Sequence, residues 1–385
     1  SSEAVNKFMA ERGWEKYLCD SCNKTFFSKP SNKAIFNCGW HECDKGSYTF
    51  RTFTKRKKIL TPAQICTKTS EYFASAGFKL VTPRNIMNFE GQTDLVIAGV
   101  QMFDDIIHRN QQIRDDKIFV AQPCVRMQFQ QHVEKQEGTS TAFVNVCTEK
   151  MGIGFNEHLQ LVDHWYTLLS RLGLHMNDFI IIMRTPIKNW GTGEFTALEL
   201  FFSYGGLELG DAAYLLIPQI GRESIPISDI GFGLERITWA INKVDSYFDT
   251  LSPYTSYGSK EMFDSCRTLA LLVLCGVRAA NKGPGLQFRR FAKVLSEKYY
   301  SEDIYHILLY YFDYWSQFIR PSVSSEAAVQ FVRLEIERFI NLKVSEMLKL
   351  PPPRDETTEV YFNRLVYTCN VDVDDLRKAI KTCKT

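Results

Sequence analysis

The sequence predicts an α+β protein in which an antiparallel or mixed sheet is flanked by helices. Runs of β-forming residues gather in the middle of the chain without regular alternation with helices, which argues against a parallel sheet. Helical periodicity dominates the last third of the 385 residues, and four cysteines lie close together near the start. We therefore expect three parts: a cysteine-rich element at 1–58, a sheet domain at 59–242 and a helical domain at 243–385.

The composition is that of a large globular chain. Hydrophobic residues make up 45% and aromatic residues 13% of the sequence, enough for a sizeable core. The net charge of +2 gives no overall basic field for a nucleic acid, although local patches could still bind one. No apolar run is long enough to cross a membrane, and the first residues lack the pattern of a signal peptide. Eleven cysteines without a secreted-domain framework favour a reducing, cytoplasmic setting.

The N-terminal cysteines have the spacing of a metal site. Cys19 and Cys22 form a C-x2-C pair, and after fifteen intervening residues Cys38 and Cys43 form a C-x4-C pair. Two such pairs close a tetrahedral thiolate site for structural zinc, which would hold a ribbon that has too little core to fold alone. His41 could replace one ligand, and four unrelated buried thiols are the alternative interpretation.

The middle part opens with a helix and continues as strands. Thr61 is a good N-cap, Pro62 suits the first helical position, and Gly77 should end the helix. Six runs then read as β-rich: 94–100, 117–127, 140–148, 179–185, 195–204 and 212–220. A helix over 156–173 interrupts them. The last part carries helical periodicity over 259–280 and 324–348, and the prolines of 350–356 break the chain.

The most informative stretch is "SDIGFGLERITWA", residues 228–240. Alternating apolar residues before it indicate a strand, and the helical spacing after it indicates a helix. Gly231 and Gly233 at this junction can take positive φ and admit another molecule close to the backbone. Arg236 in the first helical turn can stack on a ring and face phosphate oxygens, and Asp229 suits an ammonium group. A tight turn with a surface arginine is the simpler interpretation, since lone Gly-x-Gly patterns are common.

A second arginine strengthens the functional interpretation. The run "FVAQPCVRM" places Arg126 on a strand after Pro123, and if that strand borders residues 228–240, Arg126 and Arg236 face one cavity. One could hold an α-phosphate while the other covers a nucleotide, and Glu199 would bind ATP or its magnesium ion. Arginine and metal together stabilise the charge that develops at phosphorus. A substrate carboxylate is then the nucleophile, so catalysis depends mainly on positioning.

These motifs together resemble one family. The chain looks like the aminoacylation part of an archaeal-type alanyl-tRNA synthetase, a class II synthetase with an antiparallel sheet. The resemblance rests on seven stretches in the family's order: the cysteine-rich element with "CDKGSYTF", then "LVIAGVQMF", "VAQPCVR", "YGGLEL", "DIGFGLER", "RTLALLVLCGVRAANKGPGLQFRR" and "LVYTCNVDVDDLRKAI".

The resemblance implies a role for each matching residue. Arg126 would contact the α-phosphate, and Arg236 would cover the adenine on the face opposite Phe143. Glu199 would serve ATP and magnesium, Asp229 would bind the α-ammonium of the amino acid, and Gly231 and Gly233 would leave room for the nucleotide. Asn281 would read the acceptor stem of a tRNA. The alternatives are that Phe143 is ordinary core and that Asn281 is an ordinary loop residue.

Three departures from the family pattern bear on specificity. After "GGLEL" the family has a neutral polar residue, whereas this chain has Gly210 and Asp211. Unless Asp211 points to solvent, its extra carboxylate would change which substrate side chain the pocket can bind. The family's basic Gly-Arg-His run is replaced by "HVEKQEGTST", which is acidic at Glu134 and Glu137. Tyr367 stands where the family has an aspartate that recognises the acceptor stem.

A basic surface remains for an RNA. Its five members lie close together in the chain and either bind phosphates or form a solvated helix face: Arg278, Lys282, Arg289, Arg290 and Lys293. The family's editing-domain motifs do not follow in this sequence. We therefore expect an unusual substrate, tolerance of errors, rapid transfer of the product, or a piece of a longer chain.

The sequence thus predicts a specialised synthetase-like enzyme. It would activate alanine or a related small amino acid with ATP and transfer it to tRNA. A compact housekeeping synthetase fragment is the nearest alternative. A tRNA-independent ligase that passes the adenylate to an amine, thiol or carrier protein, and a non-catalytic tRNA-binding regulator, stay open.

Overall fold

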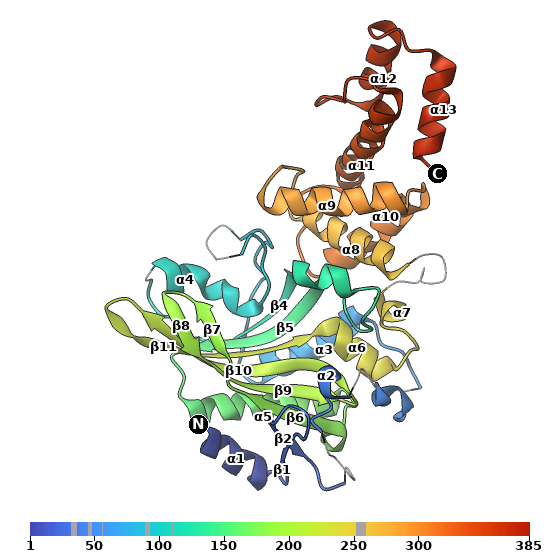
Figure 1. Cartoon of the computed structure of the whole chain (residues 1–385). Coiled ribbons are helices and arrows are strands. Elements are labelled where there is room, and N and C mark those ends of the chain that lie inside the picture. The colour runs from blue at the N-terminus through green and yellow to red at the C-terminus, as the bar shows by residue number, and fades with distance from the viewer. Residues whose placement is uncertain (32–36, 45–47, 56, 89–92, 110, 252–258) are drawn as a thin grey trace.

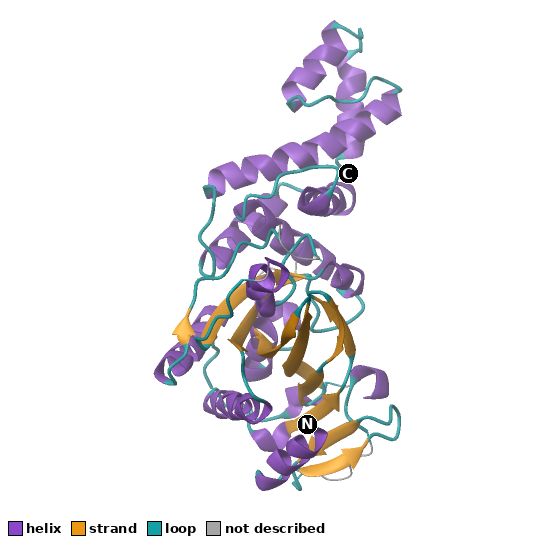
Figure 2. Cartoon of the chain, turned by 90° about the vertical axis from the view of Figure 1, so that its left-hand side faces the viewer, coloured by secondary structure: helices purple, strands orange, loops and turns teal. Residues whose placement is uncertain are grey.

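The computed structural model describes residues 1–31, 37–44, 48–55, 57–88, 93–109, 111–251 and 259–385, with only the backbone described at His41 and Asp44. A large sheet occupies the lower half of the molecule, helices α8–α10 lie above it, and α11–α13 project away at the top (Figure 1). The view at right angles shows the same two-part arrangement, with strands below and helices above (Figure 2).

Eleven strands are present in the described ranges. Nine form one sheet in the order β1-β2-β6-β9-β10-β11-β5-β4-β3, with every neighbouring pair antiparallel except β3 and β4. The strands are β1 (Glu15–Leu18), β2 (Thr25–Ser28), β3 (Lys79–Leu80), β4 (Ile118–Val125), β5 (Ala142–Met151), β6 (Phe179–Arg184), β7 (Ile187–Trp190), β8 (Gly193–Thr196), β9 (Leu198–Tyr204), β10 (Leu207–Gln219) and β11 (Arg222–Gly233). Strands β7 and β8 form a separate hairpin.

The helices fall into those that flank the sheet and those of the C-terminal part. The α-helices are α1 (Ser2–Glu11), α2 (His41–Asp44), α3 (Pro62–Ser75), α4 (Asp104–Arg109), α5 (Phe155–Arg171), α6 (Leu234–Asn242), α7 (Tyr247–Leu251), α8 (Lys260–Leu274), α9 (Gly283–Lys298), α10 (Asp303–Ser316), α11 (Ser325–Leu348), α12 (Thr358–Tyr367) and α13 (Val373–Cys383). Short 3-10 helices cover Thr49–Thr52, Gly99–Phe103, Met127–His132 and Met176–Asp178. The predicted α+β class, an antiparallel sheet flanked by helices, is therefore confirmed.

Side-chain alternation gives the sheet two different faces. Residues opposite one another on paired strands share a face, and successive residues point to opposite faces. One face carries apolar side chains such as Leu200, Phe202 and Phe232, which belong to the main core. The other face carries Glu199, Asp211 and other polar residues in the same central strands. The sheet is therefore packed on helices on one side and available for a ligand on the other.

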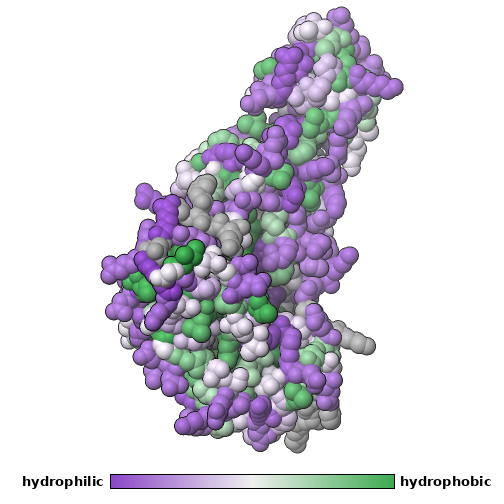
Figure 3. Space-filling model, turned by 60° about the vertical axis from the view of Figure 1, so that its left-hand side comes forward, coloured by the Kyte–Doolittle hydropathy of each residue, from purple (hydrophilic) through white to green (hydrophobic). Residues whose placement is uncertain are grey.

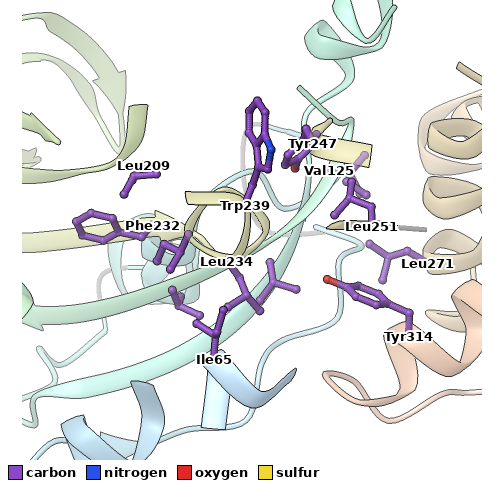
Figure 4. Close-up of a cluster of buried hydrophobic side chains, with 14 of the residues drawn as sticks. Ile65, Val125, Leu209, Phe232, Leu234, Trp239, Tyr247, Leu251, Leu271 and Tyr314 are labelled. Atoms are coloured by element: carbon purple, nitrogen blue, oxygen red, sulfur yellow. The ribbon is translucent and has the colours of Figure 1, made fainter. Parts of the chain in front are cut away.

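The core lies between the first face and helices α3, α5 and α6. The Trp165 ring stacks on Phe232 with centroids 4.6 Å apart and contacts Phe73 at 4.7 Å. Figure 4 shows Leu234 and Trp239 of α6 between the strands and the side chains Leu271 and Tyr314 of the helical part. Helix α6 is thus the element that joins the sheet to the C-terminal helices.

Several predicted element boundaries are confirmed, and one predicted strand is wrong. The α3 helix begins with a capping box between Thr61 and Gln64, has Pro62 in its first turn and is followed by Gly77 at φ 85°. Residues 94–100 were expected as β-rich, but they contain only a bridge at Leu95 and the start of the 3-10 helix Gly99–Phe103. The segment is apolar because it packs under the sheet, and a short apolar run alone does not separate these alternatives.

The expected division into three parts remains a prediction. Its limits fall between elements, because residue 58 precedes α3 and residue 242 ends α6. The cysteine-rich element is nevertheless joined to the large sheet, since β2 pairs with β6.

No helix in the described ranges is both long and apolar enough to cross a membrane. On the face drawn in Figure 3, hydrophobic residues form small groups separated by hydrophilic ones.

A fully buried ion pair connects the sheet domain to the helical part. Arg267 of α8 donates to the Glu235 carboxylate of α6 at 2.6 Å, and both side chains are 0% exposed. The same carboxylate accepts from the Val144 amide at 3.0 Å and from the Tyr314 hydroxyl at 3.0 Å. The guanidinium also lies 4.5 Å from the Trp315 ring centroid. These additional donors offset the desolvation cost of burying the two charges.

We expect removal of one partner to be far more damaging than removal of both. Glu235→Gln or Arg267→Met should each lower the free energy of unfolding by about 3–5 kcal/mol, because the remaining charge is buried without its partner. Denaturant unfolding of the two single variants and the double variant measures this directly. A double variant whose stability falls by the sum of the two single effects would contradict direct coupling.

Candidate functional site

A cavity of about 610 Å³ opens on the polar face of the sheet. Its walls come from the segment around Trp40, the ends of β4 and β5, the strands β10 and β11, the first turn of α6 and the β7–β8 hairpin. Many of the predicted site residues line it: Arg126, Phe143, Asp211, Asp229, Gly231, Gly233 and Arg236. Residues that are distant in the sequence therefore meet in one cavity, as predicted for Arg126 and Arg236.

The two arginines lie at one end and are held by backbone carbonyls. Arg236 donates through Nε to Gly138 at 2.8 Å and through Nη1 to Glu208 at 2.9 Å. Arg126 donates through Nε to Ile97 at 2.8 Å, and its guanidinium carbon is 5.0 Å from the Phe143 ring centroid. Neutral carbonyls orient each guanidinium without cancelling its charge. This end of the cavity is therefore suited to an anion.

The conformational reason proposed for the two glycines is wrong. Strand β11 continues through Gly233, whose φ is −71°, and Gly231 is not among the glycines with positive φ. A Cβ at Gly231 would instead meet the Asn145 side-chain amide at 2.5 Å. The structure thus requires glycine at 231 for space on the cavity floor and not for a turn. Asp229 correspondingly lies within the strand and not at its end.

The opposite end of the cavity is acidic. In the register of the sheet Glu199 lies opposite Ala213, Ala213 opposite Asp229, and Asp229 opposite Glu149, so one row of the same face carries three carboxyl groups. Asp211 lies in the next row, opposite Gly231. Asp211 and Asp229 keep part of their surface toward the cavity, while Glu149 is fully buried.

Burial governs the protonation of this acidic end. It raises the pKa of Glu149 well above its ordinary value, and the neighbouring charge of Asp229 raises that pKa further. The pKa of Asp211 is also raised well above its ordinary value, first by burial and then by Glu199 and Asp229. Burial and the neighbouring Asp229 thus both favour the neutral form of Glu149.

Glu199 is ion-paired with Lys188, which comes from the β7–β8 hairpin. The Glu199 side chain is 5% exposed, and Lys188 lines the cavity in its place. The sequence interpretation gave Lys188 no role. The predicted function of Glu199 toward ATP and magnesium stays a prediction, and it requires Lys188 to move or to share the carboxylate.

Other cavity residues were not singled out by sequence reasoning. Glu208 lines the cavity beside Arg236, and burial raises its pKa while Arg236 opposes that effect. Asn145 and Trp40 line it as well. The strand period was the available signal for Asn145 and Glu149, because both share a parity with Phe143 on β5. No local pattern indicated Lys188, whose position depends on a hairpin folding over the sheet.

The acidic loop "HVEKQEGTST" is bound within the fold. Glu137 forms an ion pair with Lys260 and accepts from the Tyr247 amide at 2.8 Å, and Glu134 accepts from the Glu261 amide at 2.7 Å. Hydrogen bonds and the Lys260 ion pair lower the pKa of Glu137, although its burial alone would raise it. These carboxylates attach the loop to α7 and α8, and Glu137 is partly buried there while Glu134 stays exposed.

The four predicted zinc ligands lie together. The Sγ atoms of Cys19, Cys22, Cys38 and Cys43 are all within 4.8 Å of one another. The Sγ atoms of Cys22 and Cys38 are 3.8 Å apart, close to the edge of about 3.8 Å expected for a tetrahedron with zinc–sulfur bonds of about 2.3 Å. Burial opposes ionisation of Cys19, but amide donors from Cys22 and Cys38 outweigh it and lower its pKa to about 6. The residues fit a structural zinc ion, and the His41 side chain lies outside the described atoms.

The predicted RNA-contacting residues lie away from the cavity. Asn281 precedes α9, and its amide oxygen accepts a hydrogen bond from Arg289, which also pairs with Glu335 at 3.2 Å. Arg290 is exposed on α9, and Tyr367 ends α12 with 81% of its surface exposed. None of these four residues, Asn281, Arg289, Arg290 and Tyr367, lines the cavity. A partner that contacts them and the cavity must span the helical part.

No family model matches the chain. Two solved aminoacyl-tRNA synthetases overlap part of it. The pyrrolysyl-tRNA synthetase PylSc of Desulfitobacterium hafniense is 15% identical with a TM-score of 0.35, covering 48% of this chain and 69% of that one. The asparaginyl-tRNA synthetase of Entamoeba histolytica is 11% identical with a TM-score of 0.34, covering 49% and 64%. The fold class rests on the sheet described above.

The sequence relatives are more specific. The chain is 24% identical over 257 residues to the alanine–tRNA ligase of Methanococcus maripaludis strain C7 and 24% over 253 residues to that of Methanothermobacter thermautotrophicus. These matches cover 64% and 62% of this chain. They span only 28% and 27% of the relatives' own length. The resemblance to archaeal alanyl-tRNA synthetases is thereby confirmed.

We expect chelation to loosen the cysteine-rich element without removing ATP binding. Trp40, which lies between Cys38 and Cys43, lines the cavity and packs edge-on against Phe201 at 5.5 Å, so that wall should become mobile. The carbonyls that hold Arg126 and Arg236 come from other segments. Hydrogen exchange of residues 19–43 before and after chelation, together with calorimetric ATP titration, tests this. Disappearance of ATP binding on mild chelation would contradict it.

Proposed function

We propose that this chain activates a small amino acid, alanine or a relative, with ATP and transfers it to tRNA as a specialised alanyl-tRNA synthetase-like protein. The observation that carries the proposal is one cavity with two arginines at one end and two accessible carboxylates at the other. The carboxylates can bind the ammonium group of an amino acid, and the arginines can bind the phosphates of a nucleotide, so that the two substrates lie side by side. The similarity to archaeal alanine–tRNA ligases supports it.

In the proposed reaction a carboxylate oxygen of the amino acid attacks the α-phosphorus of ATP. The new oxygen–phosphorus bond replaces the bond to the bridging oxygen, and pyrophosphate leaves with that electron pair. Arg126 would neutralise the charge on the α-phosphate as it develops, and no general base is needed because the nucleophile is already ionised. Asp229 would hold the α-ammonium and so aim the carboxylate.

The nucleotide end would use the remaining residues. Phe143, with Arg126 over its ring, offers an aromatic surface for adenine, and the Arg236 guanidinium is available to cover the opposite face. Gly231 and Gly233 leave the floor between them free of side chains. The order Phe143, base, Arg236 is the proposed binding mode.

Carboxylate oxygens suited to magnesium also lie at or beside the cavity. The Glu208 carboxylate faces the cavity beside Arg236, and Glu199 could join it if Lys188 releases that carboxylate. When bound, the ion would neutralise charge on the pyrophosphate leaving group. The role of this chain would be to hold the Glu208 carboxylate beside the guanidinium groups of the two arginines.

The helical part is the proposed tRNA-binding region. Arg290 and Lys293 are exposed on α9, and Asn281, Arg289 and Tyr367 offer further contacts. A ligase that passes its adenylate to a small amine or a carrier would have little use for this region. The internal hydrogen bonds of Glu134 and Glu137 also remove one reason to doubt RNA binding.

We expect Arg126→Ala and Asp229→Ala each to lower amino-acid-dependent ATP–pyrophosphate exchange by at least about 10²-fold, as the removal of one stabilising donor does elsewhere. Both side chains face the cavity, so the fold should persist. Exchange measured over the twenty common amino acids and several small non-proteinogenic ones, with circular dichroism as the fold control, tests the pocket. Near-normal exchange in either variant would show that the assigned pocket is wrong.

Charge reversal on α9 should weaken RNA binding without changing activation. For Arg290→Glu with Lys293→Glu, we expect a drop in tRNA affinity. The logarithm of the binding constant should also fall less steeply with the logarithm of salt concentration, by about one in slope for each phosphate that the variant no longer binds. Fluorescence anisotropy of labelled tRNA at several salt concentrations measures both effects. No binding by the unmodified protein, with exchange intact, would favour the tRNA-independent ligase.

A further inference from the structure

We propose that the amino acid taken by this cavity is a short-chain diamino acid, whose second, cationic amino group is received by Asp211. This inference rests on the proposed function and names its substrate class. It follows from the positions of the carboxyl groups around the acidic end and from the partners that each of them has.

The carboxyl groups of the acidic end differ in their partners. Glu199 is paired with Lys188, and Glu149 lies against Asp229 without any N–H or hydroxyl donor from the described residues. The α-ammonium of any amino acid would satisfy Asp229. Asp211 then has no partner of its own, because no described residue donates a hydrogen bond to it or lies within ion-pair distance. Lys188 acts on Asp211 at longer range and lowers its pKa, but the lysine is itself paired with Glu199.

An unpaired carboxylate at position 211 is costly. Asp211 lies beside Phe201 and Gly231 in the sheet register and keeps only part of its surface toward the cavity. A carboxylate there must be neutralised by a proton or by a ligand. The raised pKa of Asp211 has the same physical cause, because burial disfavours its charged form. A methyl group such as that of alanine would leave the carboxyl without a partner.

The spacing of the carboxyl groups favours an organic cation over a metal ion. Within the described residues, only the four cysteines form a group of three or more potential ligands with atoms within 4.8 Å of one another. Asp211 and Asp229 are therefore not part of such a closed set of metal ligands. Two separated carboxylates suit a molecule with two separated ammonium groups.

The distance between Asp211 and Asp229 limits the length of that molecule. Asp211 lies opposite Gly231, two residues along β11 from Asp229, so the two acids are diagonal neighbours on one face. Such neighbours lie roughly 7 Å apart at their Cα atoms. Because both carboxylates stand on the same face, the two ammonium groups would lie above them and closer together than this Cα separation. That spacing favours 2,3-diaminopropionate or 2,4-diaminobutyrate over an extended lysine.

The test compares two amino acids of almost equal size. The side chain of 2,3-diaminopropionate ends in an ammonium where that of 2-aminobutyrate ends in a methyl group. In ATP–pyrophosphate exchange with the full chain, we expect kcat/KM for the diamino acid to exceed that for 2-aminobutyrate by at least about 10²-fold, because a site built for a donor rejects the analogue that lacks it. Alanine should resemble 2-aminobutyrate.

Substitution of Asp211 should remove this preference selectively. In Asp211→Asn, the ratio between the two amino acids should fall at least about 10-fold, because the amide no longer offers a charge to the second ammonium. Asp115→Asn is the matched control, since its side chain is fully exposed away from the cavity. Thermal shift provides a second readout: with an unreactive ATP analogue, the diamino acid should stabilise the unmodified protein and the control but not Asp211→Asn.

The outcomes distinguish this inference from the proposed function. Exchange with alanine or 2-aminobutyrate equal to that with the diamino acids would overturn the inference and leave amino-acid activation standing. A preference for serine would show that the second group of the substrate is not cationic, and a preference for lysine would show that its side chain is not short. Absence of exchange with every amino acid, in a folded protein that binds ATP, would overturn both. An unchanged ratio in Asp211→Asn would remove Asp211 as the receiving group.

Discussion

The buried ion pair between Glu235 and Arg267 is the constraint on which the arrangement of this molecule depends. Glu235 immediately precedes Arg236 of the cavity, and its carboxylate accepts from Val144, the neighbour of Phe143. Arg267 lies among aromatic rings of the helical part. One carboxylate thus fixes the first turn of α6, the strand beneath the proposed adenine site and the orientation of α8. Removal of its charge would disturb the cavity and the helical part together.

Burial sets the chemistry of the cavity as much as residue type does. Backbone carbonyl oxygens orient the two arginines, whereas the carboxyl groups are crowded onto one sheet face and differ in their partners. Glu199 has a lysine, Glu149 has Asp229, and Asp211 has no such partner among the described residues. By residue type alone these acids are equivalent. Their positions in adjacent rows of the sheet give them different roles.

Much of the fold and part of the site could be predicted from the sequence, for physical reasons. The α3 N-cap and the β-rich runs of β4, β5 and β9 are local signals, and they led to correct elements. The meeting of Arg126 with Arg236 followed from the ordered motifs. Lys188 escaped notice because its contact depends on how a hairpin folds over the sheet. The positive φ expected at Gly231 was wrong, and the structure instead places the side chain of the distant Asn145 against this glycine. Local periodicity carries no information on such contacts.

The projection of α11 has a consequence for the size of any acceptor. This helix has 24 residues and therefore extends about 36 Å, and it carries Tyr367 of α12 away from the sheet. In the proposed function, an acceptor that contacts α12 and also places a reactive hydroxyl in the cavity must extend past the helical part. A duplex stem with a single-stranded end has such a reach, whereas a free amine or thiol does not. The length of α11 would then limit which acceptors can contact both places.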